Sequence, residues 1–358
     1  MTASSKGGSR FLANVDCEFD TIEIAGRTHP VSKNSSKRSG QSYVLSLRSA
    51  WIDYAKEEAI RRNYPQLRWL SKIGAYCVAS PVSLLLHVCG LDSAVTVANH
   101  LISTNLYPTW KLSDVQRLTT ELTIRYAKNP FVIRNICPEV TPDLASNLQE
   151  AGWQLIPARM VYLCDPQLKS VWKHNHVKKD AKLLTSGEFE VIRPDQICET
   201  DLPRLRTLYR QLFIAKHSKL NPDFTPEFFD LCLESGFLAL YGLRSKGEIV
   251  GVLGLYEHAE SRWLTTPLIG YDTNLSQANG IYRCLMALLL QEAKIRNLRL
   301  HYSSGASKFK RARGGEPSLE YTAVFSQHLS PVKRLANACF AKAMQKFAPS
   351  ILKEADGV

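Results

Sequence analysis

The segment from residue 236 to residue 325 restricts the fold of this 358-residue chain more than any other part of it. It begins with three short apolar runs separated by turns, which predict a three-strand antiparallel meander. A long apolar run then predicts a helix, and two further strands enclose a basic, glycine-rich loop. The predicted strands cover residues 237–243, 249–256, 263–271, 298–302 and 321–327, and the helix covers residues 277 to about 296.

A helix between the third meander strand and the next strand makes a parallel connection, whereas a meander makes antiparallel ones. The predicted fold class is therefore α/β (α+β), with a mixed, mostly antiparallel sheet and helices on both faces. Residues 113–163 read as helix–strand–helix–strand, which echoes this order and indicates an internal duplication. The predicted organisation is a mobile N-terminal arm at 1–40, a diverged, helix-rich domain at 41–165 and a second domain at 166–358.

Within the first domain, the apolar pattern predicts helices at residues 49–63, 69–86 and 92–101. Residues 73–91 carry no charged side chain and are close to the length of a membrane span, but they include Pro81 and two glycines. We interpret them as buried helix rather than a span. The polar N-terminus has no secretory signal core, so a cytoplasmic location is expected.

The formal net charge of +12 favours an anionic partner without selecting one. A basic helix predicted at residues 168–184 is either a solvated face or a contact for an anion such as the tRNA backbone. The nine cysteines include no C-x-x-C pair, which favours free thiols in a reducing compartment, and no metal site is expected.

The start of the long helix and the loop after the next strand are the two candidate phosphate sites. The helix opens in Gln277-Ala-Asn279-Gly280-Ile-Tyr282, and free backbone N–H groups at such a start attract anions. An ordinary glycine cap is the alternative. The loop at residues 303–316 is either a phosphate site or a solvated surface loop. Its cations are Lys308, Lys310, Arg311 and Arg313.

This order of elements resembles the GNAT acyltransferase superfamily, and within it the FemAB-like branch with two GNAT-like domains, which includes BioF2-like acetyltransferases. GNAT enzymes that use acyl-CoA commonly carry Q/R-x-x-G-x-G/A at this helix start. Gln277 and Gly280 match that motif, but Tyr282 stands where the family has glycine or alanine. The resemblance implies acyl transfer to an amine, with acyl-CoA or acetyl-CoA as co-substrate. The Fem-type members use aminoacyl-tRNA instead.

The resemblance also implies a general base near the strand ends and backbone donors where the third meander strand separates from its parallel neighbour. Gly270 in that strand is expected to let a ligand approach closely. The candidate catalytic residues are Glu257, Tyr271 and Glu320, with His258 and Asp272 as further candidates for the base and His301 as a structural or catalytic histidine.

Three functions follow from these patterns. The first is an N-acyltransferase that acts on the amine of a small molecule or amino acid, with acyl-CoA as donor. The second is an aminoacyl-tRNA-dependent transferase, which accounts better for Tyr282 and the basic helix. The third is a non-catalytic RNA-binding or scaffold protein. The sequence names neither the acceptor nor the oligomeric state.

Overall fold

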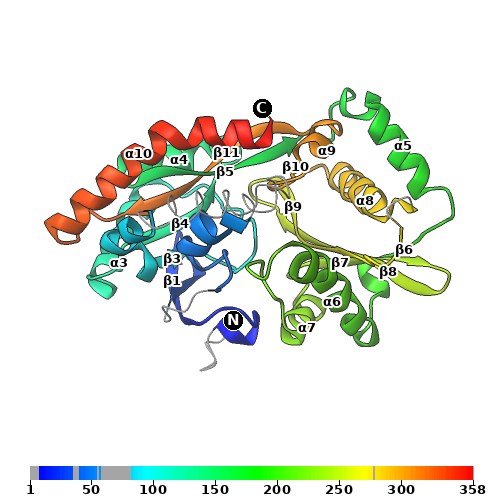
Figure 1. Ribbon diagram of the computed structural model, residues 1–358, viewed down its shortest axis with the longest axis horizontal. Coiled ribbons are helices and arrows are strands. Elements are labelled where there is room, and N and C mark those ends of the chain that lie inside the picture. The colour runs from blue at the N-terminus through cyan, green and yellow to red at the C-terminus, as the bar shows by residue number, and fades with distance from the viewer. Residues whose placement is uncertain (1–7, 35–39, 55, 58–81, 277–278, 358) are drawn as a thin grey trace, which may run out of the picture.

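The computed structural model describes residues 8–34, 40–54, 56–57, 82–276 and 279–357 (Figure 1). The strands of these residues are β1 (Cys17–Ile24), β2 (Arg27–Asn34), β3 (Val95–Val97), β4 (Phe131–Ile136), β5 (Gln154–Cys164), β6 (Glu190–Ile192), β7 (Ala239–Ser245), β8 (Glu248–His258), β9 (Trp263–Tyr271), β10 (Arg299–His301) and β11 (Glu316–Phe325). They form one sheet in the order β1-β2-β3-β4-β11-β5-β10-β9-β8-β7-β6. Of its neighbouring pairs, β3 with β4 and β9 with β10 are parallel and the rest antiparallel. The predicted mixed, mostly antiparallel sheet is confirmed.

Helices cover both faces of this sheet, as predicted (Figure 1). Over the meander β7–β9, α6 and α7 pack on one face and α8 on the other, with α5 lying against α8. At the other end of the sheet, α3 and α4 pack in one apolar core and α10 in another. The helices are α3 (Leu112–Arg125), α4 (Pro142–Glu150), α5 (Asn175–Leu184), α6 (Leu202–Arg210), α7 (Pro226–Ser235), α8 (Ile281–Ile295), α9 (Ser307–Arg311) and α10 (Pro331–Asp356).

Apart from β6 at one edge, the strand order is symmetric about the central pair β11 and β5. Strands β1 to β4 on one side correspond to β7 to β10 on the other, and each series contains one parallel pair. The last strand of each series is exchanged: β5 pairs with β10, and β11 pairs with β4. This arrangement supports the predicted duplication and ties the two halves together at the middle of the sheet.

Residues 17–34 form a hairpin at the edge of the sheet, so the predicted mobile arm is wrong for this part of the chain. Its turn lies at Ala25 and Gly26, which both have positive φ as a two-residue hairpin turn requires. Ile22 and Ile24 alternate into the core next to Val31. The hairpin therefore buries apolar side chains that the polar composition of residues 1–40 conceals.

The helix predicted at residues 92–101 is also wrong, because β3 lies there. Val95, Thr96 and Val97 are all buried, and two of them pair with β4. A run of β-branched residues fits a pleated, buried strand better than a helix. The helix predicted at residues 69–86 falls mainly outside the described residues, where only residues 82–89 of that region are seen as helix.

In the second half the predicted elements are present, most of them with small shifts at their ends. Strand β11 begins five residues before the predicted strand 321–327, and the predicted loop at residues 303–316 contains the short helix α9. The basic helix predicted at residues 168–184 is divided into a single turn, Val171–Lys173, and α5. Within the described part of the chain, no helix is both long and apolar enough to cross a membrane.

Candidate functional site

Strands β9 and β10 separate after a short parallel contact. Their pairing joins residues 299–301 to residues 263–265, and the Thr265 hydroxyl donates to the His301 carbonyl at 2.9 Å. From there the chain after β10 turns to β5, where the Tyr302 N–H donates to the Tyr162 carbonyl at 2.8 Å. The rest of β9 pairs with β8. The strands thus diverge in the way that the resemblance implied.

The start of α8 lies beside this divergence. Gly280 caps the helix in the left-handed conformation with φ 72°. Because glycine has no side chain, no side-chain hydrogen bond caps the backbone N–H groups of the first turn. Asn279 is half-buried, and its backbone N–H donates to the Ser276 carbonyl at 3.0 Å. The predicted Gln277 lies outside the described residues.

Tyr282, the second residue of α8, lies in an aromatic cluster. Its ring centroid is 4.9 Å from that of Phe309 in α9 and 6.1 Å from that of Tyr271 at the end of β9. Burial raises the pKa of Tyr282 to about 12. The third position of the motif from the sequence analysis is therefore occupied by a packed ring rather than by glycine or alanine.

The structure does not bring the four loop cations together as one phosphate site. Lys308 is exposed, and Arg311 donates to the Gly357 carbonyl at 2.8 Å. Lys310 is buried and donates to the carbonyls of Ser303 and Ser304 at 3.2 and 2.6 Å. Burial lowers the pKa of Lys310 to about 7, with a smaller contribution from the Arg159 charge.

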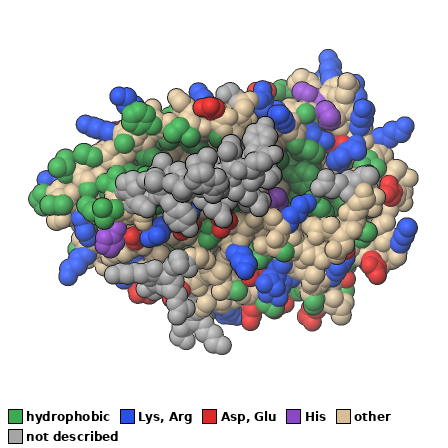
Figure 2. All heavy atoms as spheres, in the orientation of Figure 1, with side chains coloured by type: hydrophobic (Ala, Val, Ile, Leu, Met, Phe, Trp, Pro, Cys, Tyr) green, Lys and Arg blue, Asp and Glu red, His purple; other side chains and the backbone are tan. Residues whose placement is uncertain are grey.

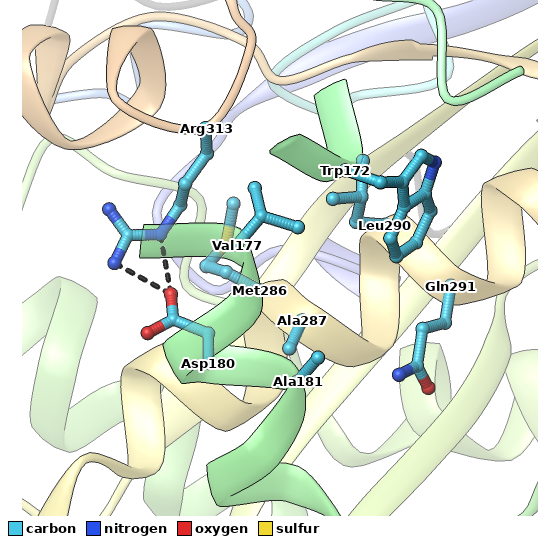
Figure 3. A pocket seen from close by; sticks show the side chains of 9 residues that line it. All are labelled: Trp172, Val177, Asp180, Ala181, Met286, Ala287, Leu290, Gln291 and Arg313. Carbon is cyan, nitrogen blue, oxygen red and sulfur yellow. Dashed lines mark hydrogen bonds and ion pairs between the residues drawn. The ribbon is translucent and has the colours of Figure 1, made fainter. Parts of the chain in front are cut away.

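Arg313, the fourth cation, is held by a carboxylate that the sequence analysis did not single out. Its guanidinium donates to Asp180 of α5 at 2.6 Å and lies 3.3 Å from the Phe309 ring centroid. Asp180 is buried and also accepts from Arg283 of α8 at 2.7 Å. Figure 3 shows Asp180 and Arg313 at one side of a groove between α5 and α8. The sequence signal for this ion pair was Asp180 itself, the one acidic residue within the predicted basic helix at residues 168–184.

Glu320 is the centre of a buried polar cluster at the junction of the two halves. One side chain comes from each of four adjacent strands: Asn135 from β4, Glu320 from β11, Arg159 from β5 and His301 from β10. The Arg159 guanidinium donates to both Glu320 oxygens, at 2.6 and 3.1 Å, and Asn135 Nδ2 donates at 2.9 Å. Burial raises the pKa of Glu320, but the Arg159 charge and the hydrogen bonds from Arg159 and Asn135 lower it by more, so the net pKa lies below its ordinary value.

His301 is neutral in this cluster. Burial lowers its pKa to about 4, although the Glu320 charge opposes this. Its Nδ1 accepts the Ser303 backbone N–H at 3.0 Å, so the ring proton is on Nε2, which lies 3.7 Å from a Glu320 oxygen. His301 therefore adds no charge to the cluster.

Arg134 on β4 adds a second buried guanidinium. It is 6% exposed and donates to the Val44 carbonyl at 2.7 Å, and no carboxylate among the described residues pairs with it. It lies 5.9 Å from the Tyr43 ring centroid. Two arginines against one carboxylate leave an excess positive charge in a buried site, which suits an anionic group of a substrate.

The predicted catalytic residues are distant from one another. Glu257 pairs with Leu264 at the start of β9 and forms an ion pair with Arg296 at 2.7 Å. Tyr271 is at the opposite end of β9, where its hydroxyl lies 3.4 Å from Lys216 Nζ. Glu320 is on another part of the sheet.

The further candidates for the base also have protein partners. His258 contacts the Ser261 hydroxyl at 2.8 Å, and Asp272 accepts from Arg204 at 2.8 Å. Gly270 faces α6 rather than a ligand, because a Cβ there would lie 2.5 Å from the Tyr209 backbone nitrogen. No group of three metal-ligating side chains occurs within the described ranges.

Comparisons with known proteins find a family model that matches part of the chain and solved structures of similar fold. Residues 173–311 match the family described as Acetyltransferase (GNAT) domain. The solved structure of FemX covers 90% of this chain and 90% of its own, at 9% identity and a TM-score of 0.51, which is a likeness of fold.

Two further structures are similar over a smaller part of the chain. The C-terminal domain of a putative lysylphosphatidylglycerol synthetase from Agrobacterium fabrum has 15% identity and a TM-score of 0.49, covering 70% of this chain and 81% of its own. L-PGS from Bacillus licheniformis has 14% identity and a TM-score of 0.45, covering 68% and 81%. No curated protein matches the sequence.

Proposed function

We propose that the protein transfers an acyl group to an amine of a small molecule or amino acid, a function that the match of residues 173–311 to the family described as Acetyltransferase (GNAT) domain supports. The divergence of β9 and β10 beside the capped start of α8 is the observation that carries this proposal. Backbone groups at such a divergence are suited to stabilise the oxyanion that forms when an amine attacks a carbonyl.

In the proposed reaction the amine nitrogen bonds to the acyl carbon and the bond from that carbon to the donor's sulfur or ribose oxygen breaks. The amine loses one proton, and the leaving sulfur or oxygen gains one. Tyr271 is close to the start of α8, and we assign to its hydroxyl the proton for the leaving group. Arg134 is suited to hold an anionic group of the acceptor. Glu320 is a poor base because its pKa is lowered, so its role is to position Arg159.

For the donor we propose an aminoacyl-tRNA. The packed Tyr282 ring in the first turn of α8 argues against a CoA pyrophosphate there, because the motif that the resemblance implies has a small residue at this position. In contrast, α5 and the turn before it present five exposed lysines that no carboxylate of the described chain pairs with: Lys169, Lys173, Lys178, Lys179 and Lys182. Figure 2 shows basic and histidine side chains gathered at the end of the molecule where α5 lies in Figure 1. Such a surface suits the phosphates of RNA.

This donor is tested by filter binding of tRNA at increasing salt. We expect Lys178, Lys179 and Lys182, replaced together by Gln, to weaken binding and to reduce the slope of log K against log salt by roughly 0.7 to 0.9 per lysine. The matched control replaces Lys111, Lys128 and Lys219, which are exposed lysines outside α5, and removes the same charge. Equal loss in both triple variants, or no binding by the parent protein, would reject the RNA donor.

Acyl-CoA, including acetyl-CoA, is the second candidate donor, because the matching family is described as an acetyltransferase. The two donors are separated by supplying aminoacyl-tRNAs and acyl-CoAs in parallel to the protein with a mixture of amines. Mass spectrometry of the products identifies the transferred group. Amide formation from acyl-CoA but not from aminoacyl-tRNA would reverse our choice of donor and leave the acyltransferase assignment unchanged.

A further inference from the structure

Helix α10 is the longest helix of the described chain, and one side of it is committed to the fold. It packs along β5, and its buried residues are Asn337, Phe340, Ala341 and Ala348. The Asn337 side chain donates to the Cys89 carbonyl at 2.9 Å, which fixes the first half of the helix. The inner face of α10 therefore packs against the rest of the fold, and its outer face is exposed to solvent.

The outer face carries a stripe of exposed apolar side chains. Val332, Leu335, Phe347 and Ile351 are 70%, 67%, 58% and 63% exposed. The exposed Cys339 and Ala343 fill the interval between them. Successive members are three or four residues apart, so they form one ridge about 28 Å long on the helix. Figure 2 shows hydrophobic side chains along the edge of the molecule where α10 runs in Figure 1. A contiguous apolar surface of this size indicates a binding face.

The charges beside the stripe are of one sign. From Pro331 to Lys353 the helix contains no Asp or Glu. Lys342, Lys346 and Lys353 are exposed, and Lys346 Nζ lies 5.4 Å from the ring centroid of Phe347. The first acidic residue is Glu354, at the end of the helix. The cations therefore flank the apolar ridge without neutralising carboxylates on the helix up to that point.

We propose that α10 binds the surface of an anionic phospholipid bilayer, with the stripe at the boundary of the acyl chains and the lysines at the headgroups. An apolar ridge flanked by lysines is the arrangement of a helix that lies in the interface. A second copy of the chain fits less well, because a two-fold contact between stripes would bring Lys342 and Lys346 of both copies together. This surface is separate from the proposed acyltransferase site.

The test is flotation of the full chain with vesicles of equal parts phosphatidylcholine and phosphatidylglycerol, compared with vesicles of phosphatidylcholine alone. We expect binding to the anionic vesicles only. Leu335→Ser with Phe347→Ser should lower the partition coefficient about tenfold or more. Lys342→Gln with Lys346→Gln should lower it about tenfold and weaken its dependence on salt. Ile124→Ser, at a position 79% exposed on α3, is the matched apolar control and should bind like the parent chain.

Melting curves of each variant check that the fold is kept. We expect it to be kept, because substitutions at exposed positions usually change stability little. Equal binding to neutral vesicles, or the same loss in the Ile124 control, would overturn the proposal. Absence of vesicle binding would also overturn it. If the parent chain is then a dimer that Leu335→Ser with Phe347→Ser converts to monomer, the stripe is a contact between copies. Amide formation measured without vesicles is independent of these results and tests the proposed function alone.

Discussion

Glu320 is a carboxylate that its neighbours keep ionised in the interior. Its side chain is 1% exposed, yet both oxygens accept from Arg159. Burial alone would favour the neutral acid, but the facing guanidinium and the Asn135 amide favour the anion more strongly. The ion pair therefore joins β11 to β5 at the place where the two halves of the sheet meet.

We predict that Glu320→Gln destabilises the fold by about 3 kcal/mol, because it leaves a buried guanidinium without its counter-charge. The folded-state pKa of Glu320 lies below its ordinary value of 4.5, so the carboxylate contributes stability above that pH and loses it as the pH falls further. Denaturant unfolding of both proteins should therefore give a difference that is constant near neutral pH and shrinks below about pH 4.5.

The control for this prediction is Glu257→Gln, which removes an exposed partner of Arg296. Exposed pairs contribute roughly 0 to 1 kcal/mol, so this variant should unfold close to the parent protein. A Glu320→Gln variant as stable as the control at neutral pH would contradict a structural role for the Arg159 pair.

The sequence analysis selected Glu320 but could not find the residues around it. Arg159 and Asn135 are 161 and 185 residues away in the chain, and only the strand exchange brings them beside Glu320. The register of β11 against β5 also shifts between Glu320 and Tyr321. A bulge of this kind changes which face each side chain occupies, so simple alternation along the strand does not predict the cluster.

Helix α6 and strand β9 approach each other at Gly270 more closely than any side chain allows. A Cβ at this position would lie 2.5 and 2.6 Å from backbone atoms of Tyr209 and Leu208. We predict that Gly270→Ala forces α6 away from the sheet and costs about 1 to 3 kcal/mol in the free energy of unfolding. Gly242→Ala is the matched strand control, because its Cβ would meet only the Ile192 side chain, at 3.1 Å. Equal destabilisation by the two changes would show that the helix contact is not the cause.

At the scale of elements, local pattern was sufficient in the second half of the chain and over residues 113–163, where α3, β4, α4 and β5 lie as predicted, but it was insufficient for the described residues before them. The meander and α8 each have a clear period and flanking turns, and β9 has the predicted bounds. In the first half, β3 has only three residues and lies between one short helical turn, Leu91–Ser93, and a loop, so a helical interpretation of residues 92–101 competed with it. Its strand conformation depends on pairing with β2 and β4, which sequence periodicity does not contain.

The whole sheet depends on two exchanged strands. The pair β5 and β11 has nine registered residue pairs, and each strand has its other neighbour in the opposite series. The domain boundary predicted near residue 165 cuts between these strands, although β11 completes the sheet of the first series. We therefore propose that the two GNAT-like units are interlocked rather than consecutive along the chain.

Interlocking predicts that the two halves unfold as one cooperative unit. If β1–β4 opened alone, β11 would lose its partner β4 and expose the apolar cores on both faces of the sheet there. Opening of β7–β10 alone would in the same way break the pairing of β10 with β5. Native-state hydrogen exchange at rising denaturant should therefore give β4 and β9 the same free energy of opening within about 1 kcal/mol. A clearly lower value for either strand, with the other still protected, would mean that the halves are separate folding units despite the exchange.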